Sequence, residues 1–257
     1  MSARLLVRPA PYSVGRPVMA AVAAVAALWA ALQPDLAVIL IGWVPYLAQG
    51  FAMNILISVA AIAIGSLIGL ILGVMELAPA RWIRAPAITY VHIFRNAPHL
   101  VLIFATTYAM PFEITLLGGT VAFPDWLKAV VGLAIPASAH IAEIVRGAIQ
   151  SIPTAQWESA GSLGFSRLRT LRWIILPQCL RRTLPAWMNL YASIAMGSAL
   201  ASLVGVGELL HAATDASTAV RRTDFTIAVY LTVLVSFFAY CYPISRLTQR
   251  LERRFAV

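Results

Sequence analysis

Long apolar stretches, each close to the length needed to cross a bilayer, dominate this sequence. They lie at about 51–75, 88–110, 126–149, 185–206 and 225–244, and a shorter one lies at 18–32. About 20 consecutive apolar residues are enough for a membrane-spanning helix. With 61% apolar and 11% charged residues, the composition fits neither a soluble globular protein nor a disordered chain. The sequence therefore predicts an all-α, polytopic membrane protein with six spans.

The first apolar stretch, 18–32, follows three arginines, Arg4, Arg8 and Arg16. A cleaved signal peptide begins in a similar way, but its apolar core is shorter and a small-residue cleavage site with a polar mature start follows it. Those features are missing here, so we expect an uncleaved first helix.

A short apolar segment, 36–47, follows Pro34 and contains Gly42 and Pro45. It is too short to cross a bilayer, and segments of this length are often interfacial or re-entrant. We therefore treat 1–48 as a separate N-terminal region, made of a cytoplasmic end, an extra helix and an interfacial segment.

The distribution of basic residues predicts the topology. Most arginines fall in the N-terminus, in the loop after the second span, in the polar stretch 150–183 and in the C-terminal tail. The opposite side has only Lys128, Arg221 and Arg222. By the positive-inside rule both termini are cytoplasmic. The same rule accounts for the net charge of +9, so we expect no nucleic acid partner.

Three glycines, Gly65, Gly69 and Gly73, form a double GxxxG pattern in the second span. They share one helix face and allow a neighbouring backbone to approach closely. Packing within the chain and a contact between two subunits both fit this pattern, and we favour the first.

The sequence offers little for catalysis. It has no GxxxxGK[ST] phosphate loop, no GxSxG or HExxH motif, and its single lysine is Lys128. Cys179 and Cys241 have no pattern of metal ligands around them. We expect no enzyme activity, catalytic residue, metal or cofactor in this chain. Glu143 and Arg146, three residues apart on one helix, are expected to pair with each other.

The polar stretch 150–183 is predicted to form a helical hairpin. Thr154 is placed to cap a first helix, and Gly164 permits a left-handed or close-packed turn. Ser166 is placed to cap a second helix at 167–175, and Pro177 is expected to end it. Such a hairpin either inserts into a groove on a soluble partner or lies on anionic lipid. The spacing leaves both possibilities open.

Within this hairpin the sequence reads Glu158-Ser159-Ala160, three residues, Gly164, nine residues, Ile174, one residue, then Leu176-Pro177. This resembles the EAA loop of binding-protein-dependent ABC transporter permeases, and only Ser159 departs from the pattern. The chain is similar in particular to the polar amino acid uptake family, which imports histidine, glutamine, arginine and opines. The residues that carry the resemblance are Gly50, 54–58, 95–100, 143–147, 176–178 and 251–254.

The resemblance implies a five-span permease core at 49–257, with residues 1–48 as an addition. It implies a bacterial inner-membrane subunit that forms half of a translocation pathway beside a second permease subunit. A periplasmic binding protein would deliver the solute, and two ATPase subunits would hold ATP and Mg²⁺ and receive the EAA loop. We expect membrane lipid as a further partner. Pathway contacts are expected at Arg95, Asn96, Met196 and Ser198.

One departure from the family pattern falls in the fifth span. Where the family usually has a Lys-Asp-Thr-Ser-Leu-like run, this chain has Met196-Gly197-Ser198-Ala199-Leu200. The loss of two charges suggests a heterodimer in which this subunit is not the only solute-binding half. An altered solute would explain the change equally well. The alternative to a transporter is a membrane scaffold whose basic hairpin holds lipid or a cytosolic partner.

Overall fold

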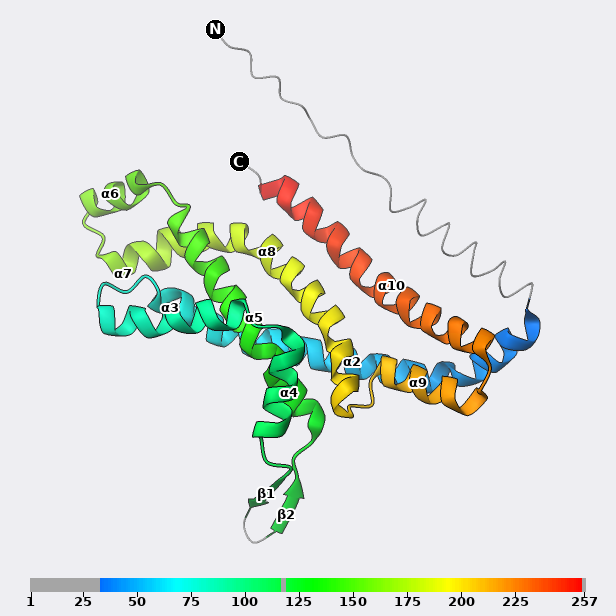
Figure 1. Cartoon of the computed structure of the whole chain (residues 1–257). Coiled ribbons are helices and arrows are strands. Elements are labelled where there is room, and N and C mark those ends of the chain that lie inside the picture. The colour runs from blue at the N-terminus through cyan, green and yellow to red at the C-terminus, as the bar shows by residue number, and fades with distance from the viewer. Residues whose placement is uncertain (1–32, 117–118, 256–257) are drawn as a thin grey trace.

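The computed structural model describes residues 33–116 and 119–255 (Figure 1). The helix expected at 18–32 lies outside these residues. Within them, four helical segments are long and apolar enough to cross a membrane, and a shorter apolar helix accompanies them. The four are Pro34–Met75, Asp125–Gln150, Arg167–Val204 and Thr223–Phe255, and the shorter one is His99–Ala109. The predicted all-helical membrane architecture is confirmed, apart from one small hairpin of strands, but the described part does not establish six spans.

Helix α2 (Pro34–Met75) is a single helix of 42 residues, about 63 Å long at 1.5 Å per residue. The prediction of a separate interfacial segment at 36–47 was therefore wrong. Leu36 and Leu47 are buried against Phe225 and other side chains of α9 (Leu209–Val220) and α10 (Thr223–Phe255). This packing holds the first part of α2 helical despite Pro45.

Among the described helices, α2 and α5 (Asp125–Gln150) share the most extensive contact. All three glycines of the GxxxG series face α5: Gly65 lies against Ala137, Gly69 against Ser138 and Ile141, and Gly73 against Ala142. A methyl group on Gly69 would lie 2.5 Å from the carbonyl oxygen of Ser138. The glycines therefore serve packing within the chain. Buried side chains of α2, α5 and α8 make up the main core around this contact, among them Ile57, Leu133 and Ile194.

The third predicted span, 88–110, is broken in two. Helix α3 (Arg81–Arg95) ends at Asn96, and α4 (His99–Ala109) begins after Pro98. Ala97 precedes Pro98, and a residue before proline avoids the helical region of backbone conformation. At the end of α3, the side-chain amide of Asn96 donates to the backbone carbonyl of His92 at 2.8 Å. After α4, strands β1 (Glu113–Leu116) and β2 (Gly119–Ala122) pair antiparallel in a hairpin that projects from the bundle (Figure 1).

The polar stretch after α5 folds into α6 (Thr154–Ser162), α7 (Arg167–Thr170) and the π-helical turn η1 (Leu171–Ile175). Helix α8 (Leu176–Gly197) follows directly and ends in the 3₁₀ segment η2 (Ser198–Val204). Pro177 was expected to end a helix and the fifth span to begin near Pro185. Instead the chain stays helical from Arg167 to Val204. The π turn and the first turn of α8 accommodate Pro177, so its missing N–H does not interrupt the helix.

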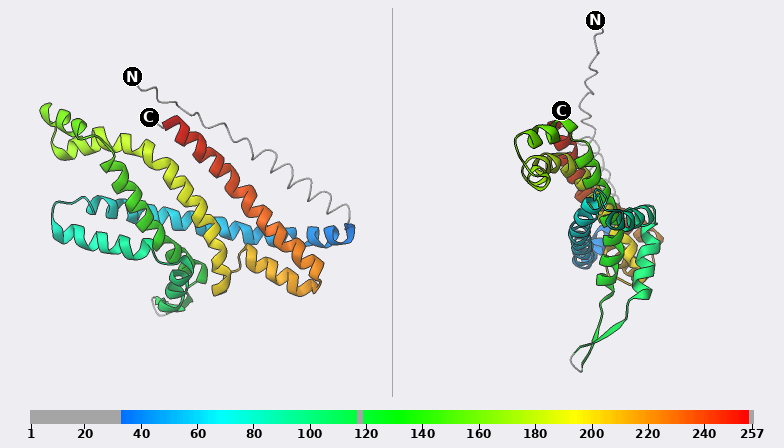
Figure 2. Two further views of the ribbon diagram at one scale, coloured as in Figure 1. Left: turned by 45° about the horizontal axis from the view of Figure 1, so that its top comes forward. Right: turned by 90° about the vertical axis from the view of Figure 1, so that its left-hand side faces the viewer.

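The two ends of the molecule are built from different elements. Helices α6, α7 and the start of α3 gather at one end, and α9 with the first part of α2 lies at the other (Figures 1 and 2). The long helices α2, α8 and α10 run between these ends, and α5 runs from the side of the strand hairpin to the α6–α7 hairpin (Figure 1). The α6–α7 hairpin is therefore placed outside the apolar bundle, where a partner can reach it.

Candidate functional site

The α6–α7 hairpin turns at Gly164. The N–H of Gly164 donates to the carbonyl of Gly161 at 2.9 Å, and that of Phe165 donates to the carbonyl of Ala160 at 3.0 Å. These two bonds form a Schellman motif, which needs a left-handed residue at its centre. Gly164 has φ +77°, and nothing lies within 4 Å of where a Cβ would be. Of the two turns considered for Gly164, left-handed or close-packed, the left-handed one occurs. Glycine is favoured here by its backbone conformation and not by a lack of space for a side chain.

The expected capping side chains are not used. Thr154 is the first residue of α6, and Pro153 occupies the capping position. No side-chain hydrogen bond caps this helix. Ser166 does occupy the capping position of α7, again without a side-chain cap. The hairpin is stabilised by other contacts.

The base of the hairpin is fixed to the bundle. Ile175 is completely buried among apolar side chains from the end of α5 and the start of α8. The amide of Gln178 donates to Oε1 of Gln156 at 2.6 Å, which joins α8 to α6. The guanidinium of Arg182 donates to Oγ of Ser151 at 2.9 Å. A hairpin held in this way moves with α5 and α8 as one body.

The tip of the hairpin, by contrast, is exposed and apolar. Leu163 and Leu168 are 76% and 74% exposed, and Phe165 lies between them with 39% exposed. Of the EAA residues, Glu158, Ser159 and Gly164 are exposed, Ala160 is buried, and Ile174 lies within the base. Leu176 and Pro177 lie at the start of α8. Apolar side chains in this number, projecting on a rigid support, are typical of a surface that binds another protein.

Four charged side chains form a network between the end of α2, the end of α3 and α5. Arg146 pairs with Glu143 as predicted, and its Nε lies 3.2 Å from Oε2 of Glu76. Nη1 of Arg95 lies 3.4 Å from Oε1 of Glu143. Glu76 is nearly buried and its Oε2 has no aligned hydrogen-bond donor. Burial raises the pKa of Glu76, and the charge of Arg146 partly opposes that rise.

A second polar network was not predicted from the sequence. Asn54, Ser198 and Glu208 are all at least 98% buried, and they join α2, η2 and the start of α9. The amide of Asn54 donates to Oγ of Ser198 at 2.9 Å and to Oε2 of Glu208 at 2.8 Å. Glu208 also caps α9 by accepting the N–H groups of Leu210 and His211. An asparagine within an apolar span was the available signal.

The four expected pathway residues do not gather at one place. The Ser198 side chain is enclosed in the buried network. Met196 is 54% exposed on α8. Arg95 and Asn96 lie where α3 ends, the first in the ion-pair network and the second bonded to its own helix.

Comparison with known proteins identifies the family. Residues 65–257 match the family described as "Binding-protein-dependent transport system inner membrane component". The chain belongs to this family of inner-membrane permeases. The match includes α5, the whole α6–α7 hairpin and all later elements. This membership favours the permease interpretation over a scaffold that transports nothing, and it makes the protein a multi-pass component of the bacterial inner membrane.

Relatives of this permease extend over most of its length. It is 33% identical to the probable amino-acid ABC transporter permease protein YckA of Bacillus subtilis over 82% of this chain and 90% of that protein. It is 31% identical to the histidine/lysine/arginine/ornithine transport system permease protein HisM of Salmonella typhimurium, over 81% of this chain and 89% of that protein.

Solved structures agree with this assignment. A chain from a crystal structure of an amino acid ABC transporter with histidines is 27% identical to this permease, with a TM-score of 0.73 over 84% of this chain and 96% of that one. A chain of the methionine ABC transporter MetNI in an inward-facing conformation shares the fold. It is 20% identical, with a TM-score of 0.62 over 80% of this chain and 96% of that one.

Proposed function

We propose that this permease is one of two membrane subunits of an ATP-driven amino acid importer and docks an ATPase subunit through the tip of its α6–α7 hairpin. The observation that carries the proposal is the exposed apolar tip around Leu163 and Leu168 on a base fixed to α5 and α8. A partner that moves the tip thereby moves the helices that cross the membrane. Coupling of this kind drives alternating access by rigid-body motion.

The amino acid substrate is proposed from the relatives, whose names refer to amino acids in general or to histidine, lysine, arginine and ornithine. ATP and Mg²⁺ would be held by two ATPase subunits, since the sequence has no phosphate loop. A periplasmic binding protein would supply the solute. Both termini would be cytoplasmic, on the side of most arginines. The permease core would include the whole of α2, because this helix runs without a break from Pro34 to Met75.

The EAA residues would have distinct tasks at this interface. Glu158 and Ser159 are exposed and available to polar groups of the ATPase, whereas Ala160 and Ile174 support the hairpin from within. Gly164 sets the turn. Arg95, Asn96 and Met196 are proposed to face the solute pathway once the second permease subunit is present.

A co-purification experiment tests the docking. The tagged chain is extracted from its native membrane in mild detergent, and the proteins that accompany it are identified by mass spectrometry. We expect an ATPase with wild type, little or none with Leu168→Glu or Gly164→Arg, and a normal amount with Ala219→Glu, an exposed position on α9. An ATPase that stays bound to both tip variants would refute docking through the hairpin.

Transport is tested separately with the complex in proteoliposomes, ATP inside and radiolabelled amino acids outside with the binding protein. ATP-dependent uptake of at least one amino acid is expected. A complex that contains the ATPase, hydrolyses ATP and moves none of the twenty amino acids would leave the docking intact and refute the substrate class.

A further inference from the structure

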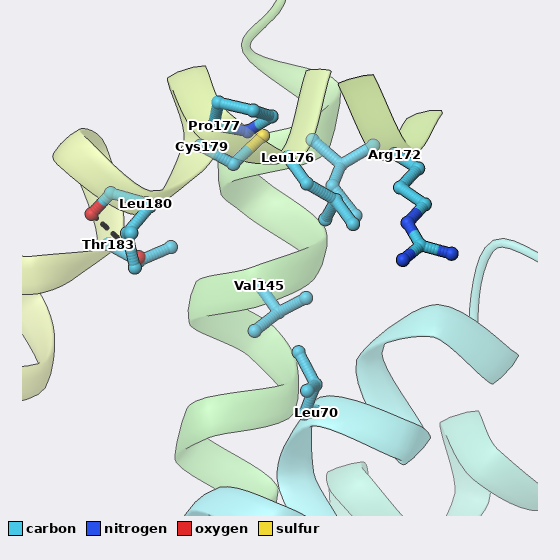
Figure 3. A pocket seen from close by; sticks show the side chains of 9 residues that line it. Leu70, Val145, Arg172, Leu176, Pro177, Cys179, Leu180 and Thr183 are labelled. Atoms are coloured by element: carbon cyan, nitrogen blue, oxygen red, sulfur yellow. Dashed lines mark hydrogen bonds between the residues drawn. The ribbon is translucent and has the colours of Figure 1, made fainter. Parts of the chain in front are cut away.

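An apolar groove lies beside the base of the hairpin, between α2, α5 and the junction of η1 with α8 (Figure 3). Its volume is about 410 Å³. Three leucines line its open side, Leu70 of α2 with 49% exposed, and Leu176 and Leu180 of α8 with 36% and 66% exposed. Val145 and Ile149 of α5 also line it. Leu70, Val145 and Ile149 belong to helices long and apolar enough to cross a membrane, so we expect bilayer hydrocarbon beside this part of the groove.

The groove has a cation at one end. Arg172 of η1 lines it and is the only charged residue among its lining residues (Figure 3). Within 33–116 and 119–255, no acidic side chain forms an ion pair with Arg172. The next residue, Trp173, is 66% exposed, with its ring 5.6 Å from the guanidinium. An exposed tryptophan next to an arginine is typical of the membrane–water boundary.

The surroundings of Arg172 are also basic. A second pocket, of about 350 Å³, shares Pro177 with the groove and is lined by Arg181, Arg182 and Arg254. Arginines of η1, α8 and the end of α10 therefore line the apolar groove or the pocket next to it. Basic pockets between membrane helices on the cytoplasmic side bind the head groups of anionic lipids.

We propose that the groove binds an anionic phospholipid of the adjoining leaflet, with one acyl chain along Leu70, Val145 and Leu180 and the phosphate at Arg172. The ligand that fits is an amphiphile, because the site is apolar along its length and cationic at its end. A free amino acid has no long apolar part to occupy the groove. The site joins α2 to the base of the hairpin, so the lipid stabilises the two against each other. This deepens the lipid contact expected for the permease and does not depend on which solute it transports.

Native mass spectrometry of the purified complex tests the site. The probe is a mixture of equal parts phosphatidylglycerol and phosphatidylcholine with identical acyl chains, added to delipidated protein. We expect wild type to retain phosphatidylglycerol about fivefold more than phosphatidylcholine, as one added arginine contact predicts. Arg172→Gln should remove that preference, and Leu70→Trp should reduce retention of both lipids because the indole fills the groove.

Two controls separate this site from general attraction to a basic surface. Arg169→Gln removes a charge from the same hairpin, and Leu67→Trp adds an indole to α2, but neither residue lines the groove. Both should leave lipid retention at the wild-type value. An equal loss in Arg169→Gln and Arg172→Gln, or undiminished retention in Leu70→Trp, would overturn the proposal.

A photo-crosslinking side chain at Leu180 identifies the occupant directly. We expect a crosslink to phosphatidylglycerol in vesicles of the same mixture. A crosslink to a second permease subunit or to the ATPase, without lipid, would show that protein covers the groove and would refute the lipid site. This outcome is independent of the docking test, which concerns the tip of the hairpin.

Discussion

The side-chain amide of Asn54 donates a hydrogen bond of 2.8 Å to the carboxylate of Glu208, across 154 residues of chain and inside the fold. Asn54 belongs to the longest helix, and Glu208 caps the helix that packs on it. The backbone of α2 comes so close here that a methyl group on Gly50 would lie 2.8 Å from the carbonyl carbon of Glu208. This polar contact fixes the position of α9 on α2.

Asn54→Leu tests how much the network contributes to stability. The substitution removes one donor from Ser198 and from Glu208, and it leaves the buried N–H of Leu209 without its acceptor. An unsatisfied buried group costs about 1–3 kcal/mol, so we expect a loss of about 3 kcal/mol in the free energy of unfolding. Thermal unfolding in detergent measures it. Asn189→Leu, at an exposed position of α8, should have little effect, and equal shifts in the two variants would contradict this role.

Glu208→Gln tests the protonation of the carboxyl group. Burial raises the pKa of Glu208, and the N–H of Leu210 and the amide of Asn54 partly oppose the rise. The folded state therefore holds the proton to a higher pH than the unfolded state does. The resulting stability is fully present below about pH 4 and is lost as the pH rises through the folded-state pKa. We expect the wild-type melting temperature to fall relative to that of Glu208→Gln between pH 4 and 8. Parallel curves would show that the group does not titrate in this way.

Gly164→Ala and Gly161→Ala form a matched pair in the hairpin. Neither methyl group would meet an atom within 4 Å, but only Gly164 has a positive φ. An alanine in the left-handed region costs about 1–2 kcal/mol, whereas alanine favours a helix over glycine by about 1 kcal/mol. We expect faster hydrogen exchange over 154–170 in Gly164→Ala and slower exchange in Gly161→Ala. The same direction of change in both would refute the conformational role of Gly164.

Gly69→Ala tests the close contact of α2 with α5. The added methyl group would lie 2.5 Å from the Ser138 carbonyl oxygen and 2.7 Å from Cβ of Ile141. Overpacking of this kind costs about 1–3 kcal/mol of stability. We therefore expect the melting temperature to fall. Gly42→Ala is the control in the same helix, because nothing lies within 4 Å of its added methyl group. It should be neutral or slightly stabilising.

The double substitution Met196→Lys with Gly197→Asp tests the missing charges of the fifth span. Met196 is 54% exposed, and a Cβ on Gly197 would lie at an ordinary contact distance of 3.6 Å from Leu133. If the pathway passes this point, the uptake rate or the preferred amino acid should change, whereas Met196→Leu should leave both unaltered. Unchanged uptake in the double variant would count against a functional meaning of the departure.

The sequence alone determined the features that depend on local chemistry. The apolar stretch 126–149 became α5 at Asp125–Gln150 almost residue for residue, because length and hydropathy suffice to specify a spanning helix. The turn at Gly164 and the pair of Glu143 with Arg146 also follow from residues a few positions apart. The EAA spacing was enough to indicate the permease family.

Only the tertiary structure decided the features that depend on distant residues. Whether 36–47 continues α2 depends on its packing against Phe225, 178 positions after Leu47 (225 − 47). Pro98 breaks one predicted span, whereas the π turn before Pro177 keeps another helical segment continuous. Ser198 was expected to face the pathway, but Asn54 and Glu208 enclose it. A hydropathy pattern records the preference of each residue for lipid or water, and the partner that satisfies a buried polar group is decided only when the helices pack.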